Sequence, residues 1–357
     1  MDQINEYSNI TANILQKIGL NLHNKTNHPI CIMKEHLYTY FRNNYGCVTF
    51  DSLSPVVSVD DNFDKLLIPS DHPARSKSDT YYINETSVLR THTTAHQNNL
   101  LMQGYKNFLV TGDVYRKDEI DKYHYPVFHQ MEGIIKITSD GELFTCLNNL
   151  VGYMFPGCEY RINNDYFPFT NPSYEVEVFY NNKWIEILGC GIVHNDILKK
   201  IDTDEKYLAF GLGLERLCMI YFEIPDIRYF WSTNDKFINQ FESGITSKFK
   251  PYSDLSSQSD DISFWIENDN IIDNKWNQEN DFFEIVRNNC GEFVESVTHV
   301  ETFVHPKTKK TSRLYRIIFS PDTSNLKNQA EFTKLRIQMF NDLKNIIKES
   351  NLEITLR

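Results

Sequence analysis

The segment from Arg116 to Glu132 combines side chains that could bind a nucleotide and an amine. Arg116 follows the strand-like run NFLVTGDVY, and after a charged and aromatic loop a second strand is predicted to begin near Val127. Phe128, Gln130 and Glu132 alternate on that strand and therefore share one face. A guanidinium can fork onto phosphate, a ring can stack on a base, and an amide with a carboxylate can hold an ammonium group. The hairpin could hold ATP and an amine, although a barrel-like hairpin with incidental polar residues explains the pattern equally well.

Two further segments could complete such a site. Arg216 lies in the first turn of the predicted helix GLGLERLCMIYFEI, after Gly211 and Gly213, where it could cover a base. Many helices begin with glycine and carry a Glu-Arg pair, so this pattern alone is weakly specific. In FPFTNPSYEVEV, Phe167 and Phe169 are predicted to lie on one face of a strand. Two core phenylalanines are the commoner explanation, and a pocket that grips another ring edge-to-face is the functional one.

The segment RTHTTAHQ gathers hydroxyl, amide and imidazole groups after the apolar pair Val88-Leu89. Such a turn suits hydrogen bonding to a substrate through residues such as His92 and Thr94. It could equally be the start of a helix, with Thr94 as the N-cap.

The elements that must position these residues follow from hydrophobic periodicity. Residues 7–22 predict a helix behind a possible Ser8 cap, and residues 28–41 predict a second helix with Pro29 in its first turn. From Val48 to Phe230, apolar and polar residues alternate only partly along short β-rich runs, as in an antiparallel sheet with one functional face. One strong helix is predicted at residues 211–224.

A Pro, Ser and Asp-rich stretch at residues 251–260 is interpreted as a linker. Beyond it the order βαββαβ predicts a ferredoxin-like unit with strands at 262–267, 294–303, 312–320 and 352–357 and helices at 280–291 and 328–350. Its strands lack the aromatic signature of an RNA-recognition motif.

Charge and cysteine usage limit the functional classes. The net charge of −12 argues against indiscriminate nucleic-acid binding, but residues 297–348 hold ten Lys or Arg against four Asp or Glu. A selective polyanion partner or simply a solvated basic face explains that stretch. Seven scattered cysteines contain no CxxC pair, so neither a zinc site nor a disulfide framework is indicated. No apolar run is long enough for a membrane span, and the N-terminus resembles neither a signal peptide nor a transit peptide.

Together these segments resemble a known family. GDVYR…FHQMEG resembles motif 2 of the class II aminoacyl-tRNA synthetases, and FGLGLERLCMIYFEIPDIRYF resembles motif 3. DHPAR, RTHTTAHQ, FPFTNPS and WIEILGCG resemble the phenylalanyl-tRNA synthetases in particular. The C-terminal unit, with ISFWI and FVHPKTKKTS, is similar to the anticodon-binding domain of the monomeric mitochondrial form. The resemblance covers nearly the whole chain, and the motifs are highly specific as a set.

The resemblance implies an α+β fold, in which a class II antiparallel sheet flanked by helices precedes a ferredoxin-like domain. The implied boundaries are N-terminal helices at 1–45, a catalytic domain at 46–250, a linker at 251–260 and an anticodon-binding domain at 261–357. A hinge near residues 240–260 would let the chain reach both ends of tRNA.

The resemblance also assigns roles to the matching positions. The catalytic residues would be Arg116, Arg216 and Glu186. The residues around ATP would be Arg116, Tyr123, His124, Tyr125, Phe128, Glu186, Phe210 and Arg216. The residues around phenylalanine would be His92, Thr94, Ala95, His96, Gln97, Gln130, Met131, Glu132, Phe167, Phe169, Ala209 and Gly211. Within these sets, Phe128 and Arg216 would sandwich adenine, and Ala209 would help to exclude the tyrosine hydroxyl.

The implied reaction activates L-phenylalanine with ATP, assisted by Mg²⁺ near Glu186, and transfers it to tRNA(Phe). The expected tRNA contacts are Lys307, Lys309, Lys310 and Arg313. The family type implies a monomer of the mitochondrial matrix without an obligate protein partner or membrane partner.

Three departures from the family pattern stand out. Thr94 occupies a position where the pattern has serine, and Asp118 replaces a glutamate. The stretch between Glu132 and Phe167 is shorter than the pattern predicts, which could alter a lid or a tRNA contact. Two other interpretations are an adenylating enzyme for another acid and a non-catalytic tRNA-binding relative. Phe167, Phe169 and Ala209 argue against the first, and retention of Arg116, Arg216 and Glu186 argues against the second.

Overall fold

A seven-stranded sheet forms the centre of the N-terminal part of the chain. The computed structural model describes residues 6–232, 234–252, 255–267, 271–272, 275–322 and 324–357. The strand order is β1-β5-β6-β10-β9-β8-β7, and every neighbouring pair is antiparallel except β1 with β5. In that order the strands are Val48–Phe50, Asn107–Tyr115, Val127–Ile137, Lys206–Gly213, Lys183–Val193, Thr170–Tyr180 and Tyr160–Asp165.

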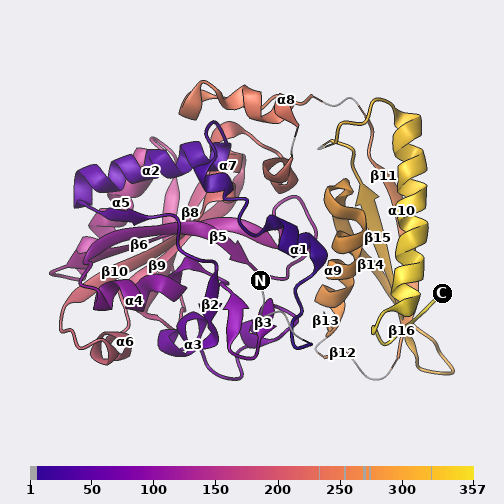
Figure 1. Cartoon of the computed structure of the whole chain (residues 1–357), viewed down its shortest axis with the longest axis horizontal. Helices are drawn as coiled ribbons and strands as arrows, with labels where there is room; N and C mark the ends of the chain where they lie inside the picture. Colours follow the sequence, from indigo (N-terminus) through magenta and orange to yellow (C-terminus); the bar gives the residue numbers. More distant parts are fainter. Residues whose placement is uncertain (1–5, 233, 253–254, 268–270, 273–274, 323) are drawn as a thin grey trace.

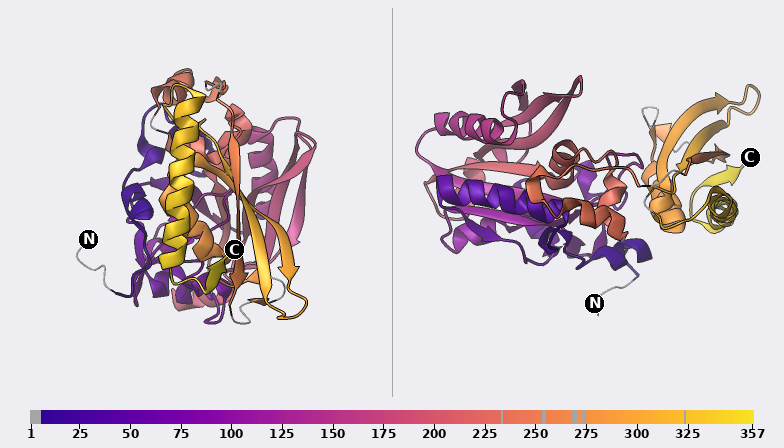
Figure 2. Two further views of the ribbon diagram at one scale, coloured as in Figure 1. Left: turned by 90° about the vertical axis from the view of Figure 1, so that its right-hand side faces the viewer. Right: turned by 90° about the horizontal axis from the view of Figure 1, so that it is seen from above.

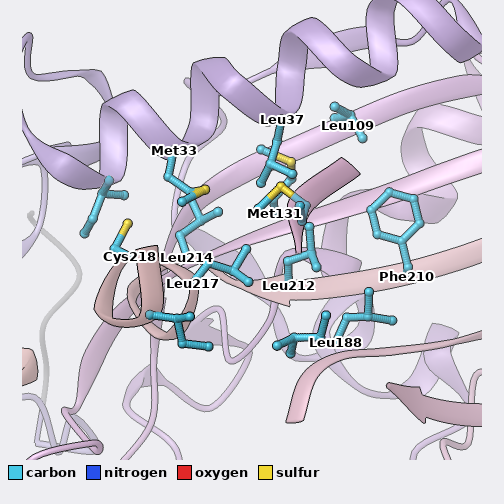
Figure 3. Close-up of a cluster of buried hydrophobic side chains, with 14 of the residues drawn as sticks. Met33, Leu37, Leu109, Met131, Leu188, Phe210, Leu212, Leu214, Leu217 and Cys218 are labelled. Atoms are coloured by element: carbon cyan, nitrogen blue, oxygen red, sulfur yellow. The ribbon is translucent and has the colours of Figure 1, made fainter. Parts of the chain in front are cut away.

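One face of this sheet is buried under three helices. These are α2 (Pro29–Tyr45), α5 (Gly141–Met154) and α7 (Leu214–Phe222). Figure 3 shows Leu37 of α2 and Leu217 of α7 meeting Met131 and Leu212 of the sheet. Burial of these apolar side chains, at roughly 25 cal/mol per Å², fixes the helices to the sheet.

The other face carries a second, smaller core and stays open toward the candidate site. A three-stranded sheet, β2-β4-β3, covers part of it with the short helices α3, α4 and α6. The bounds are Val56–Ser58, Ser87–Leu89 and Tyr82–Asn84 for the strands, and Val59–Asn62, Gln97–Met102 and Asn195–Lys200 for the helices.

The predicted N-terminal helices have different outcomes. The second is confirmed as α2, with Pro29 at its first position and Gly46 in the left-handed region at its end. The first was predicted too long, because α1 covers only Ala12–Lys17 and Gly19 has a φ of +81°. Thr11 caps α1, and the Ser8 hydroxyl donates to the Tyr82 carbonyl oxygen instead.

The sequence reading also missed α5. Its apolar residues recur at three- and four-residue spacing, which is the usual helical signal, but lie within a region interpreted as β-rich. The short helix α8 (Asp235–Ile238) was not anticipated either.

The C-terminal unit has the predicted βαββαβ order and a sheet of order β14-β15-β11-β16. Its strands, in that order, are Val294–Val304, Thr311–Phe319, Gln258–Ile266 and Ile354–Leu356, and its helices α9 and α10 are Glu279–Cys290 and Gln329–Glu349. β11 begins within the stretch interpreted as a linker, and a small ladder pairs β12 (Ile271–Ile272) with β13 (Lys275–Trp276). Both helices cover one face of the sheet, and the other face is turned away from them (Figure 2).

The two units meet at several places, one of which is the contact of α9 with the 116–126 loop that joins β5 to β6. Arg287 of α9 donates to the carbonyl oxygens of Asp118 and Glu119, at 2.9 and 3.0 Å. The Val297 N–H donates to the Ile120 carbonyl oxygen at 2.9 Å, and the Ile120 side chain is buried in the C-terminal core.

The N-terminal segment and β3 region extend this interface around Glu284. Its carboxylate accepts hydrogen bonds from the hydroxyls of Thr11 and Tyr81, both at 2.8 Å. Figure 1 shows α1 beside α9 accordingly. Among the described residues, no helix is long and apolar enough to cross a membrane.

Candidate active site

The β5–β6 hairpin brings the predicted nucleotide residues together. The ladder ends at Tyr115 opposite Val127, so the second strand begins at the predicted residue. The Arg116 Nε donates to the Thr91 carbonyl oxygen at 2.7 Å, and its guanidinium carbon lies 5.3 Å from the centre of the Phe128 ring. The hydrogen bond to the Thr91 carbonyl oxygen holds the guanidinium beside the Phe128 ring.

A buried carboxylate lies further along the same strand face. The Thr94 hydroxyl donates to Oε2 of Glu132, while Oε1 of Glu132 has no hydrogen-bond partner among the described residues. Burial raises the pKa of Glu132 to about 8, although the bond from Thr94 opposes this shift. Thr94 therefore orients the carboxylate and is not a helix cap. An unpaired buried carboxylate oxygen is suited to a cationic ligand.

Glycines form the floor beside Glu132. Gly211 of β10 pairs with Glu132 on one side and Gly189 of β9 on the other. A Cβ on Gly189 would come within 2.7 Å of the Phe167 ring, whereas one on Gly211 would meet nothing within 4 Å. The strands thus leave room above the sheet for a ligand. The sequence analysis missed Gly189, although the spacing in WIEILGCG could have shown it on one face with Gly191.

Aromatic side chains form another wall. Phe167 and Phe169 precede β8 in a turn and do not lie on a strand as predicted. Their rings stack with centroids 5.9 Å apart, and the Phe169 ring centroid lies 6.0 Å from that of His92. Burial lowers the pKa of His92 to about 3, with the charge of Arg116 acting in the same direction, so His92 is neutral at physiological pH.

The start of α7 contributes an exposed charged pair. Arg216 Nη1 lies 3.1 Å from the Glu186 carbonyl oxygen and 3.2 Å from its carboxylate. Adjacent Glu215 is buried and receives the His129 N–H at 2.8 Å, while its other oxygen lies 2.7 Å from His129 Nδ1. These two contacts fasten α7 to β6 where the β10 ladder ends, and neither was predicted.

Most of the predicted residues line one cavity of about 700 Å³. These residues are His92, Thr94, Arg116, Tyr123, His124, Tyr125, Phe128, Gln130, Glu132, Phe167, Phe169, Glu186, Ala209, Phe210, Gly211 and Arg216. Within this group the ring of Phe210 lies in the core, 4.8 Å from the Phe41 ring centroid (Figure 3). The Tyr125 ring stacks on Trp231, and its hydroxyl donates to Glu292 of the C-terminal unit.

Four predicted phenylalanine-binding residues do not line the cavity. Met131 points into the helix-covered core, because strand alternation places it on the other face of β6 from Gln130 and Glu132 (Figure 3). The His96 ring contacts the Arg90 guanidinium at 2.9 Å, and Ala95 is buried in the smaller core. Gln97 hydrogen bonds to its neighbour Asn98.

Of the predicted tRNA contacts, three are exposed and one is buried. Lys307, Lys309 and Lys310 are exposed in the turn between β14 and β15. Arg313 is buried and contacts Glu279 at 3.1 Å, because alternation along β15 turns it toward the helices.

Within the described part of the chain, Glu186 and a cluster in the 116–126 loop offer carboxylates for a metal ion. The exposed Glu186 carboxylate at the cavity could join substrate phosphates, which is how Mg²⁺ is commonly held. Glu119, Asp121 and His124 also place ligand atoms within 4.8 Å of one another. In that cluster Asp121 already accepts hydrogen bonds from two backbone N–H groups and contacts the His124 ring.

The sequence of this chain is similar to those of known proteins. The family model "tRNA synthetases class II core domain (F)" matches residues 11–241. The chain is 44% identical over 330 residues to "Phenylalanine--tRNA ligase, chloroplastic/mitochondrial" of Arabidopsis thaliana, covering 87% of this chain and 75% of that one. It is 40% identical over 364 residues to "Phenylalanine--tRNA ligase, mitochondrial" of Mus musculus (88% and 79%) and 37% identical over 423 residues to that of Dictyostelium discoideum (99% and 90%).

The fold and the site therefore define a class II aminoacyl-tRNA synthetase. Within that class, the chain belongs to the phenylalanine–tRNA ligase family of mitochondrial type.

Proposed function

We propose that the chain activates L-phenylalanine with ATP to form phenylalanyl-adenylate and pyrophosphate, and then transfers phenylalanine to tRNA(Phe) for organellar translation. The relatives' names and the contents of the cavity support this reaction. The proposal rests above all on one observation. Glu132, the glycine floor and the Arg116–Phe128 pair lie next to one another on one face of the sheet.

Glu132 would bind the substrate ammonium through its unpaired oxygen, with Gln130 beside it on the same strand face. The rings of Phe167 and Phe169 would contact the substrate ring, and the small side chain of Ala209 would leave a tyrosine hydroxyl without a partner. A buried unpaired hydroxyl costs roughly 1–3 kcal/mol, which is the discrimination available without editing.

ATP would occupy the side of the cavity near Phe128. Adenine would stack on this ring, and Arg216 would cover its other face after leaving Glu186. Arg116 would bind the α-phosphate and the substrate carboxylate, so that the carboxylate attacks phosphorus in line with the leaving pyrophosphate. Catalysis would rest on positioning and charge neutralisation. Mg²⁺, held by Glu186 and the phosphates, would supply further neutralisation.

The first test is amino-acid-dependent ATP–pyrophosphate exchange without tRNA. We expect exchange with phenylalanine, weak exchange with tyrosine and none with the other amino acids. Exchange with a different amino acid would overturn the assignment of the pocket. Folded protein that shows no exchange with any amino acid would favour a non-catalytic relative.

The C-terminal unit would bind the anticodon stem of tRNA. Its exposed turn offers Lys309 and Lys310 for phosphates, and such contacts make affinity salt-sensitive. Reversing both lysines to glutamate should raise the KM for tRNA and leave adenylate formation unchanged. An equal loss in both steps would contradict this role.

We also infer that the chain works as a monomer in the mitochondrial matrix. The mitochondrial naming of the relatives from mouse and Dictyostelium supports the organelle, and the resemblance to the monomeric family type supports the monomer. Organelle fractionation of the tagged chain and light scattering of the purified protein would test both points.

A further inference from the structure

Asn62, at the end of α3, is a buried polar residue that the proposed reaction does not use. Its neighbour Phe63 lines the cavity, whereas Asn62 does not. The Asn62 side chain is 0% exposed, yet both polar atoms of its carboxamide have partners. Oδ1 accepts the Thr91 N–H at 3.1 Å, and Nδ2 donates to the Thr91 hydroxyl at 3.0 Å. We call these two hydrogen bonds the Asn62–Thr91 clamp.

The carboxamide of asparagine matches the two groups that Thr91 presents. It offers an acceptor and a donor in one plane, and Thr91 presents a backbone donor and a hydroxyl that can accept. An apolar side chain at position 62 would leave both groups of Thr91 buried without partners. Aspartate would satisfy the N–H only by burying a negative charge. The clamp therefore requires the residue type that the chain has.

Thr91 connects the clamp to the cavity. Its carbonyl oxygen accepts the hydrogen bond from Arg116 Nε at 2.7 Å, and both Thr91 and Arg116 line the cavity. Within the described residues, the Arg116 side chain makes no other hydrogen bond. The two terminal nitrogens of its guanidinium are thus available to a ligand, while the third nitrogen is held by Thr91.

Backbone pairing restrains the residue before Thr91. The Arg90 N–H donates to the Pro55 carbonyl oxygen at 2.8 Å, and the Tyr115 N–H donates to the Arg90 carbonyl oxygen at 2.9 Å. Residues 90 and 91 therefore bridge the segment 55–62 to the end of β5. Because the backbone fixes Arg90 and the clamp fixes Thr91, the Thr91 carbonyl group has a defined direction.

The position of the Arg116 guanidinium matters for the proposed reaction. This group would hold the α-phosphate and the substrate carboxylate in line for attack. A misplacement of about 1 Å in such a geometry can slow a reaction roughly a hundredfold. Asn62 does not line the cavity, so its effect on the reaction would pass through Thr91 and Arg116.

We propose that Asn62 is a positioning residue of the adenylation reaction, because its carboxamide fixes Thr91 and the Thr91 carbonyl oxygen sets the place of the Arg116 guanidinium. This inference rests on the proposed function, since it takes Arg116 as the group that binds the α-phosphate. The sequence analysis did not single out Asn62, because its partner lies 29 positions away along the chain.

The first test compares two ligands of the full chain by calorimetry. Phenylalaninol carries the ammonium group and the ring, and phenylalaninyl adenylate, its ester with AMP, adds the α-phosphate and adenine. We expect Asn62→Ala to weaken binding of the adenylate by roughly tenfold to a hundredfold, the range for losing a hydrogen bond to a charged group. Binding of phenylalaninol should change by less than about twofold. A purely structural role would weaken both ligands equally.

A double-mutant cycle shows whether the effect passes through Arg116. In the Arg116→Ala background, Asn62→Ala should weaken adenylate binding by less than about twofold, because the group that it positions is gone. Thr91→Val tests the clamp without a large change in volume, since it removes only the hydroxyl that Asn62 binds. It should lose part of the affinity, and Thr91→Ser, which keeps the hydroxyl, should retain most of it.

A ligand-free measurement reports on the clamp itself. In protein labelled with [15N]arginine, the Arg116 Nε–H signal is identified by its loss in Arg116→Ala. We expect this proton to exchange slowly with solvent in the wild type and faster in Asn62→Ala, because the Thr91 carbonyl group is no longer held in place.

Asn107, at the other end of the same hairpin, gives the matched control. Its side chain also makes two hydrogen bonds, to the Tyr45 carbonyl oxygen at 2.8 Å and from the Lys136 N–H at 2.9 Å. Asn107→Ala should bind phenylalaninyl adenylate as the wild type does and leave the Arg116 Nε–H signal unchanged. Thermal unfolding of each variant shows whether a loss of binding reflects a loss of fold.

Three outcomes would overturn the role of Asn62. These are equal losses for the two ligands, the same loss with and without Arg116, and unchanged exchange of the Arg116 Nε–H in Asn62→Ala. The proposed function fails differently. A wild-type chain that binds neither ligand, but whose Arg116 Nε–H is protected only when Asn62 is present, would contradict the enzyme and retain the clamp.

Discussion

At the scale of single residues, Glu132 couples substrate binding to protons. Its pKa of about 8 means that the free carboxyl is largely protonated at pH 7. A bound ammonium group would stabilise the carboxylate and lower this pKa, so binding at pH 7 should release nearly one proton. Affinity for phenylalanine should therefore rise with pH up to about 8, below the pKa of the amino acid's own ammonium group.

Calorimetry in buffers of different ionisation enthalpy measures that proton directly. Glu132→Gln should abolish the proton release and weaken phenylalanine binding by about 2–5 kcal/mol, the usual cost of truncating a buried charge pair. Wild-type protein that binds phenylalanine without releasing a proton would show that the ammonium group lies elsewhere.

Gly211 tests whether the substrate occupies the floor of the cavity. A methyl group there meets nothing within 4 Å in the protein, so Gly211→Ala should fold with little change in stability. It should nevertheless raise the KM for phenylalanine in exchange by roughly fivefold to a hundredfold, because overpacking a filled site typically costs about 1–3 kcal/mol. Gly152→Ala in α5, which also has open space, is the control. An unchanged KM would place the substrate away from β10.

The sequence predicted correctly which side chains share a strand face, because this depends only on the two-residue alternation of a strand. Phe128, Gln130 and Glu132 line the cavity together because they share a strand face. By the same rule, Met131 faces the helix-covered core and Arg313 faces the helices of the C-terminal unit. The site prediction grouped residues by their proximity in sequence and did not separate the two faces of a strand.

At the scale of elements, the contact between Glu215 and His129 joins the helix that carries Arg216 to the strand that carries Phe128. Glu215→Ala would leave the His129 N–H buried without its acceptor, which costs about 1–3 kcal/mol. Because the adenine slot would lie between the two elements, the KM for ATP should rise more than that for phenylalanine.

Tyr38→Phe is the matched control for this element. It removes a buried hydrogen bond of 2.9 Å to Thr111 on the same sheet, away from Arg216. Chemical denaturation should show a loss for both variants, and exchange kinetics should show an ATP effect only for Glu215→Ala. Similar ATP kinetics in both would reduce Glu215 to a purely structural role.

Element prediction failed where local patterns compete. The α5 sequence has helical spacing but follows a long β-rich run, and Phe167 and Phe169 alternate like strand residues while forming a turn. The small sheet β2-β4-β3 has strands of three residues, too short for alternation to be informative.

At the scale of the whole molecule, the C-terminal unit holds the 116–126 loop beside the cavity. Arg287→Ala would remove two bonds to loop carbonyls and the cation paired with buried Glu284, which we expect to cost roughly 3–5 kcal/mol of interface stability. Hydrogen exchange of residues 117–125 should accelerate at least about tenfold, and the KM for ATP should rise.

Arg336→Ala, which removes a pair with Asp260 inside the C-terminal unit, is the control. If loop exchange were unchanged in Arg287→Ala, the interface would not restrain the loop. This interface could not be predicted from sequence, because Arg287 binds main-chain oxygens and the partners lie far apart along the chain.

The burial of Ile120 in the C-terminal core bears on modular engineering of this chain. A gene cut in the connection before β11 would produce two fragments, one with an exposed isoleucine and one with a hole in its core. The boundary between the two units along the sequence therefore differs from their boundary in three dimensions. A chimaera that exchanges the C-terminal unit would need to carry a matching 116–126 loop with it, although that loop belongs to the other half of the gene.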